Sequence, residues 1–179
     1  KNKRTALFYT AVFLFFATIA AAQKKEYTYR NAKDTTQNFY YSLIPENKTE
    51  GFYDYATAKD VLAWHIKYIG PYAYKKLANV QSKTMFGGME NAGAIFYHEG
   101  SVTGKRMEEE LQSHEIVHQW FGNHATEKSF AHLWLSEGFA TYLTHIYMES
   151  KYGTDSLNKR MKADRETVLD FVKTSKRPV

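Results

Sequence analysis

The feature that most constrains this chain is His-Glu-Ile-Val-His, in which two histidines stand four residues apart. On an α-helix, residues i and i+4 lie one turn apart on the same face, so His114 and His118 can direct both imidazoles to one point. Glu137 follows after 18 further residues, inside Leu-Trp-Leu-Ser-Glu-Gly-Phe-Ala. Catalytic zinc sites typically combine three nitrogen or oxygen ligands with a water. We therefore expect one zinc ion at these three residues.

Glu115, between the two histidines, is predicted to act differently. At ~3.6 residues per turn it stands about 100° around the helix from His114, so it overlooks the open position of the metal. A carboxylate in that place can serve as general base for a metal-bound water. The alternative is that the motif arises by chance on an ordinary amphipathic helix, which the second acidic motif downstream disfavours.

Composition limits both the ligands and the partners. The chain has 179 residues, enough for one domain with a core, and its 44% hydrophobic content is typical of a globular protein. It contains no cysteine, so a metal must be bound by nitrogen and oxygen atoms. The net charge of +5 could suggest nucleic acid, but 24 basic residues are dispersed among 19 acids. We interpret the charge as a solvated surface and expect no nucleic-acid partner.

The first 22 residues have the three-part pattern of a secretory signal peptide. A basic start precedes an apolar run from Ala6, and three alanines ending at Ala22 form a small-residue site. The alternative is an uncleaved anchor, because the 17 residues from Ala6 to Ala22 reach the lower limit for spanning a bilayer. We favour cleavage and export, to the periplasm or by secretion. A membrane is a partner only if this segment stays uncleaved.

The rest of the chain alternates turn signals with periodic apolar runs. Residues 23–50 are polar and are predicted to be a linker, with one short extended run at 39–44. Apolar spacing predicts helices over 56–69, 108–121, 132–152 and from 154 onward, and strands over 77–81 and 92–97. Aromatic residues of the third helix are expected in the core: Trp134, Phe139, Tyr142 and Tyr147. Four histidines without ligand spacing are expected at the surface or in packing: His98, His124, His132 and His145.

A glycine-rich segment, residues 85–91, separates the two predicted strands. Gly87 and Gly88 allow a ligand to approach the backbone closely, and Glu90 adds a negative charge beside them. The alternative is a plain hairpin turn that joins the strands. The zinc motif downstream favours the first interpretation.

These motifs, in this order, resemble the gluzincin aminopeptidases of the aminopeptidase N and leukotriene A4 hydrolase family. Residues 86–91 resemble that family's Gly-x-Met-Glu-Asn motif, and the similarity covers residues 51–179. The resemblance implies an α+β fold, namely a mainly helical, thermolysin-like zinc peptidase catalytic domain with a small β-sheet. The family's β-sandwich domain, transition-state tyrosine and helical C-terminal domain find no counterpart in these residues. We therefore expect an incomplete catalytic domain over 51–179, with weak activity or none.

The resemblance also implies roles for the individual residues. The zinc ligands are those expected above, with Glu115 as the base that activates the water. Glu90 is implied to bind the free α-amine of a peptide, and the backbone of Gly87, Gly88 and Met89 to form an edge on which the peptide lies. The implied function is a zinc metallo-aminopeptidase that cleaves the first peptide bond. Two alternatives stay open: a zinc-binding module without activity, and a zinc endopeptidase, which has no need of Glu90.

Overall fold

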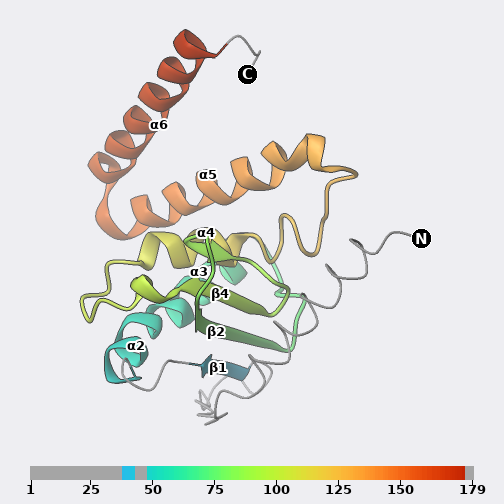
Figure 1. Ribbon diagram of the computed structural model, residues 1–179, viewed down its shortest axis with the longest axis vertical. Helices are drawn as coiled ribbons and strands as arrows, with labels where there is room; N and C mark the ends of the chain where they lie inside the picture. The colour runs from blue at the N-terminus through green and yellow to red at the C-terminus, as the bar shows by residue number, and fades with distance from the viewer. Residues whose placement is uncertain (1–37, 43–47, 176–179) are drawn as a thin grey trace, which may run out of the picture.

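The computed structural model describes residues 38–42 and 48–175. The predicted signal peptide and most of the predicted linker lie outside the described residues. The described elements, in chain order, are β1 (Asn38–Ser42), α2 (Lys48–Tyr55), α3 (Thr57–Tyr68), β2 (Lys76–Ser82), β3 (Gly88–Met89), β4 (Ala94–His98), η2 (Glu99–Ser101), α4 (Glu109–Val117), η3 (Phe130–His132), α5 (Leu133–Tyr152) and α6 (Thr154–Thr174). The fold is mainly helical with one small sheet, as the resemblance implied (Figure 1).

The sheet has four described strands in the order β1-β2-β4-β3. β1 and β2 are parallel, β2 and β4 are parallel, and only β3 and β4 are antiparallel. The hairpin alternative for residues 77–97 is therefore wrong, because parallel neighbours need a crossover rather than a turn. Gly88 and Met89 lie within that crossover as a short edge strand, opposite Tyr97 and Phe96 of β4.

The described parts of the predicted linker carry regular structure. β1 pairs with β2 in register from Asn38 opposite Lys76 to Ser42 opposite Val80. The expected boundary at residue 50 falls inside α2, which begins at Lys48. The unit that contains the sheet thus starts before Gly51.

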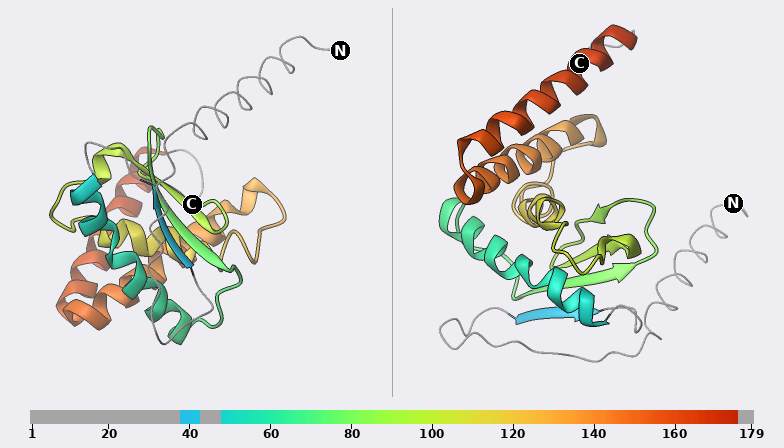
Figure 2. Two further views of the ribbon diagram at one scale, coloured as in Figure 1. Left: turned by 90° about the horizontal axis from the view of Figure 1, so that it is seen from below. Right: turned by 90° about the vertical axis from the view of Figure 1, so that its left-hand side faces the viewer.

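The core lies where the helices meet the sheet. α4 packs against α3, α5 and β3, while α5 also packs against α6 (Figure 2). Eleven buried residues form one cluster that draws on the sheet and on four helices: Tyr55, Ala58, Val61, Leu62, Leu77, Ile95, Tyr97, Ile116, Trp120, Tyr147 and Met148. The helix that bears the histidine motif is thus surrounded by the core, and its register is fixed by packing.

Two acidic residues fix the position of α4. Buried Asp54 accepts hydrogen bonds from the backbone N–H groups of Thr103 (2.6 Å), Gly104 (2.7 Å) and Arg106 (2.7 Å), which hold the loop that leads into the helix. Buried Glu109, in the first turn, accepts hydrogen bonds from Tyr147 and Tyr152 and forms an ion pair with Lys151. These contacts tie α4 to α5, so the motif helix and the helix of Glu137 keep a fixed relation.

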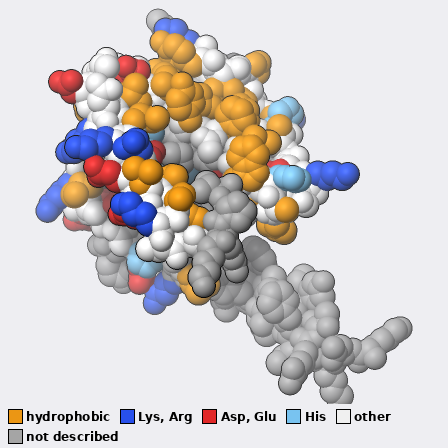
Figure 3. All heavy atoms as spheres, turned by 90° about the horizontal axis from the view of Figure 1, so that it is seen from above, with side chains coloured by type: hydrophobic (Ala, Val, Ile, Leu, Met, Phe, Trp, Pro, Cys, Tyr) orange, Lys and Arg blue, Asp and Glu red, His pale blue; other side chains and the backbone are white. Residues whose placement is uncertain are grey.

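Helices α5 and α6 differ from the predicted packing. Tyr147 is buried, but Trp134, Phe139 and Tyr142 are exposed, so their expected core placement is wrong. Apolar side chains gather on the face shown in Figure 3. The exposed apolar side chains of α6 include Val168. α6 buries none of its residues against the rest of the described chain.

Among the described residues, no helix is both long enough and apolar enough to cross a membrane.

His65 of α3 gives the fold a dependence on pH. Its ring is fully buried, its Nε2 lies 3.0 Å from Ser113 Oγ, and burial lowers its pKa from 6.5 to about 3. The folded state therefore keeps His65 neutral while the unfolded state takes up a proton below pH 6.5. We expect His65 by itself to lower the free energy of unfolding by roughly 2 kcal/mol between pH 8 and pH 5, taken as the difference between the parent chain and His65→Gln in urea titrations at the two pH values. An identical pH dependence in the parent chain and in His65→Gln would contradict the assignment.

Candidate metal centre

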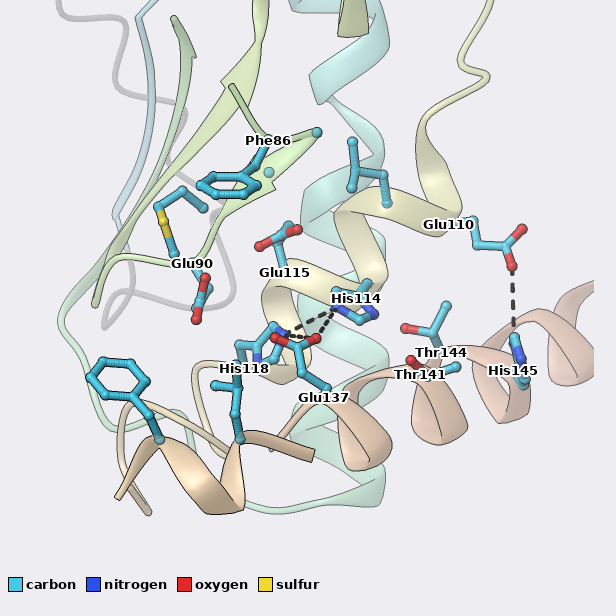
Figure 4. A pocket seen from close by; sticks show the side chains of 16 residues that line it. Phe86, Glu90, Glu110, His114, Glu115, His118, Glu137, Thr141, Thr144 and His145 are labelled. Carbon is cyan, nitrogen blue, oxygen red and sulfur yellow. Dashed lines mark hydrogen bonds and ion pairs between the residues drawn. The ribbon is translucent and has the colours of Figure 1, made fainter. Parts of the chain in front are cut away.

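Three predicted ligand residues converge at one point between α4 and α5. Glu137 Oε2 lies 3.1 Å from His114 Nε2 and 3.4 Å from His118 Nε2, and the two histidine nitrogens are 3.1 Å apart (Figure 4). Among the described residues, these three side chains form the group whose donor atoms lie close enough together to share a metal ion. α4 places both histidines on one face, and α5 brings Glu137 opposite them.

The donor set fits a tetrahedral metal ion. Atoms bound to zinc at ~2.0–2.1 Å in tetrahedral geometry are about 3.3 Å apart, close to the three separations observed. His118 Nδ1 lies 3.0 Å from the carbonyl oxygen of Phe121, which can only accept, so Nδ1 carries the proton. Nε2 of the neutral ring then has a free lone pair directed at the other two donor atoms. A backbone carbonyl that fixes the tautomer in this way is typical of metal-binding histidines.

Glu115 stands beside this group and is not part of it. Its side chain is buried, and burial, followed by the charges of Glu90 and Glu137, raises its pKa to about 8. Burial and the neighbouring His118 lower the pKa of His114, while Glu137 and Glu90 oppose that effect. Three carboxyl groups, those of Glu90, Glu115 and Glu137, lie around the two imidazoles and form a site that a bound cation would stabilise.

Gly88 of β3 makes room for the Glu115 carboxyl group. A Cβ on Gly88 would lie 2.2 Å from Glu115 Oε1 and 2.3 Å from its Cδ, whereas a Cβ on Gly87 would meet only Leu111, at 3.6 Å. We expect Gly88→Ala to displace the Glu115 carboxyl group. If this chain hydrolyses peptides, the variant should lower kcat for that hydrolysis by up to ~10²-fold with KM nearly unchanged, since displacement of a reacting group by about 1 Å can cost that much. Gly87→Ala is the matched control. Equal kcat in the two variants would show that the contact is unimportant.

The segment before β4 is held onto the motif helix by polar contacts. The carbonyl oxygen of Glu90 accepts hydrogen bonds from Gln119 Nε2 (2.9 Å) and Asn123 Nδ2 (2.5 Å). Gln119 Oε1 in turn accepts the backbone N–H of Gly93 at 2.8 Å. The glycine-rich segment and Glu90 are thus clamped to the turn that follows His118. Sequence patterns gave no role to Gln119 and Asn123, although both closely follow the motif.

A cavity of about 710 Å³ joins these parts into one site. The three possible ligands, Glu115 and the predicted substrate residues Gly87, Gly88, Met89 and Glu90 all line it. Residues with no predicted role also line it: Glu110, Thr141, Thr144 and His145. His145, expected at the surface or in packing, is buried in the cavity wall. The packing of α4 on α5 brings these four residues to the site, so their spacing along the chain could not predict that they line it.

Comparison with known proteins identifies the family. Residues 53–179 match the sequence model of the peptidase family M1 domain, which is more than half of the chain. The chain belongs to peptidase family M1. Probable aminopeptidase 1 of Saccharolobus solfataricus is 34% identical over 114 residues, covering 58% of this chain and 14% of that protein. Aminopeptidase M1-C of Oryza sativa subsp. japonica is 38% identical over 90 residues, covering 45% of this chain and 10% of that protein.

The fold agrees with this membership of family M1. The structure of native yeast LTA4 hydrolase superposes with a TM-score of 0.70 at 19% sequence identity, over 84% of this chain and 24% of that one. At that identity the likeness concerns the fold. The matched segment spans about one-seventh of the archaeal relative's length and one-tenth of the rice relative's.

Proposed function

We propose that this chain carries the reaction centre of a zinc-dependent aminopeptidase. The observation that supports the proposal best is the convergence of His114, His118 and Glu137 in one cavity that also holds Glu115 and Glu90. Membership of family M1, and the name aminopeptidase on the relatives matched, support it independently.

The three converging residues would hold the zinc ion. Zinc supplies a Lewis acid there and lowers the pKa of a water bound to it. His118 is oriented for this role by its Nδ1–H donating to the Phe121 carbonyl. Glu137 is positioned by α5, which the ion pair between Glu109 and Lys151 holds against α4.

Glu115, in its charged form, is the group that accepts a proton from the attacking water, and the positive charge of a zinc ion at the three ligands would favour that form. It is buried beside the ligands and lines the same cavity, so its carboxyl group is within reach of a water bound there. Gly88 leaves space for the carboxyl group to lie against β3. Proton transfer by a positioned carboxylate typically contributes 10²–10⁴-fold to a rate.

Glu90 and β3 are proposed to bind the substrate. β3 is an edge strand of the described sheet, so its backbone can pair with an extended peptide. The Glu90 carboxylate lies close enough to the centre to affect the pKa of both His114 and Glu115. A carboxylate in that place would pair with the ammonium group of a free N-terminus and limit cleavage to the first residue.

The proposal predicts that Glu90 discriminates free from blocked peptides. A charge-assisted hydrogen bond is worth ~1.5–3 kcal/mol, so Glu90→Gln should lower kcat/KM for a free peptide by roughly 10–100-fold. The N-acetylated form of the same peptide should respond little, because it carries no ammonium group. Hydrolysis is measured by chromatographic release of the first residue. Internal cleavage of the acetylated peptide at a rate equal to the free one would favour the endopeptidase, and no cleavage of either would favour the inactive module.

A further inference from the structure

The cavity has two chemically different ends. In Figure 4, Glu90 and Phe86 lie on one side of the group formed by His114, Glu115, His118 and Glu137. Glu110, Thr141, Thr144 and His145 lie on the other side, where the first turn of α4 faces the middle of α5. We refer to these last four residues as the far end of the cavity.

The role assigned to the far end rests on the proposed function, which gives the cavity a direction. If Glu90 holds the α-amine, the first peptide bond lies at the centre and the second residue extends toward the far end. Glu110 is four residues before His114 and His145 is eight after Glu137, about 6 Å and 12 Å along their helix axes. A long side chain on the second residue therefore points to Glu110 and His145.

His145 presents an unused polar atom at the far end. The residue is 6% exposed, and its Nε2 lies 2.7 Å from Asp164 Oδ2 on α6, a carboxylate that can only accept. Nε2 therefore carries a proton, and Nδ1 is an acceptor when the ring holds no second proton. Nδ1 has no hydrogen-bond partner within the described part of the chain and faces Glu110 Oε1 at 3.9 Å. One group that carries two or more donor hydrogens can satisfy both acceptors at once.

The charge around the far end favours a cationic donor. Four acidic residues line the cavity: Glu90, Glu110, Glu115 and Glu137. The described lining of the cavity contains no lysine and no arginine. Arg160 of α6 binds both oxygens of Glu110, with Nε–Oε1 and Nη2–Oε2 distances of 2.8 Å, but it does not line the cavity. Arg160, which lies outside the cavity lining, thus fixes the orientation of the Glu110 carboxylate. Asp164, which His145 contacts through Nε2, adds a further negative charge.

We propose that Glu110 and His145 form the subsite for the second residue of the substrate and select lysine or arginine there. The ammonium or guanidinium group donates to Glu110 Oε1 and to His145 Nδ1 together. The competing arrangement is a protonated His145 held between Glu110 and Asp164, which already supplies the missing donor. That arrangement predicts no preference at the second residue, so the two differ in the experiment.

The test compares the free peptides Leu-Lys-Gly, Leu-norleucine-Gly and Leu-Glu-Gly. Norleucine matches the lysine stem without its charge. We measure kcat/KM for each by release of leucine, and the dissociation constant of each by calorimetry with the zinc-loaded Glu115→Gln variant, which gives a readout when no turnover occurs. We expect a preference for lysine over norleucine of at least about tenfold in both measurements, and the weakest binding for glutamate.

Two variants separate a direct role from a structural one. Glu110→Gln removes the acceptor charge and leaves Arg160 in place, so the lysine preference should disappear or reverse. Arg160→Gln removes the compensating cation and leaves Glu110, so the preference should increase. Glu166→Gln, an exposed acid on α6 outside the cavity lining, makes the same charge change and should alter nothing. If Glu110 only held α6 in place, Glu110→Gln and Arg160→Gln would change the preference in the same direction.

Each outcome bears on one proposal or the other. Cleavage of all three peptides at equal rates would overturn the subsite and leave the aminopeptidase standing. A lysine preference in binding that Glu110→Gln abolishes, without any cleavage by the parent chain, would support the subsite and refute hydrolysis by this chain. A lysine preference that persists unchanged in Glu110→Gln would overturn the assignment of the subsite to Glu110. Absence of both binding and cleavage would overturn both proposals.

Discussion

Replacing Glu115 with glutamine should lower hydrolysis by ~10²–10⁴-fold while zinc binding stays intact. The amide keeps the shape of the side chain but cannot accept a proton. The fold should tolerate the change, because burial and the neighbouring carboxylates already raise the pKa of Glu115 and disfavour its charged form. The checks are release of the first residue from a free peptide, zinc content by elemental analysis and the free energy of unfolding in urea.

The control for this variant is Glu166→Gln, an exposed acid of α6 that should retain full activity. Loss of zinc from Glu115→Gln would show that Glu115 is a ligand, against the geometry of the site. Retained hydrolysis would show that another group accepts the proton.

His118→Ala should abolish stoichiometric zinc binding. His118 is almost fully buried, and its Nε2 lies 3.1 Å from His114 Nε2 and 3.4 Å from Glu137 Oε2, so its loss removes one of the three donor atoms. Zinc at 1,000 times its dissociation constant stabilises a folded protein by about 4 kcal/mol. We expect the thermal midpoint of the parent chain to rise on addition of zinc, and that of the variant to stay unchanged.

The cavity that alanine leaves in the core lowers stability with or without metal, so the comparison is made within each protein. Differential scanning calorimetry of each chain with zinc and with chelator isolates the contribution of the metal. His124→Ala, at an exposed histidine away from the site, should keep the full zinc-dependent shift. A zinc-dependent shift of equal size in His118→Ala would remove this residue from the metal centre.

Local spacing predicted the parts of this protein that local interactions determine. The helices over 56–69 and 132–152 correspond closely to α3 and α5, because a glycine follows each apolar period: Gly70 has φ 136° and Gly153 has φ 84°. The helix predicted over 108–121 is α4 up to Val117 and then tightens, with Trp120 N–H bonding to the Val117 carbonyl. The turn brings the Phe121 carbonyl to His118, which a regular helix would not do.

Pairings between distant segments could not be predicted from spacing. Strands β2 and β4 have the composition of a hairpin, but the crossover through β3 makes them parallel. The exposed rings of Phe139 and Tyr142, three residues apart, follow the helical period, and periodicity identifies an apolar face without saying what covers it. Glu110 and His145 meet because α4, α5 and α6 pack together, which no motif encodes.

In the candidate site, too, local spacing predicted some residues, and tertiary packing determines the others. His114 and His118 come together on one helix, and a spacing of 18 residues was enough to suggest Glu137. The support around them is tertiary: the Glu109 contacts that hold α5, the Gln119 clamp on Glu90, and the space that Gly88 leaves for Glu115.

The most direct test of the metal centre is anomalous diffraction from crystals of this chain grown with zinc, recorded on both sides of the zinc absorption edge. We predict one peak, within about 2.0–2.2 Å of His114 Nε2, His118 Nε2 and a carboxylate oxygen of Glu137, with Glu115 outside that shell. No peak at this point, or a peak that Glu115 ligates in place of one of the three, would contradict the account.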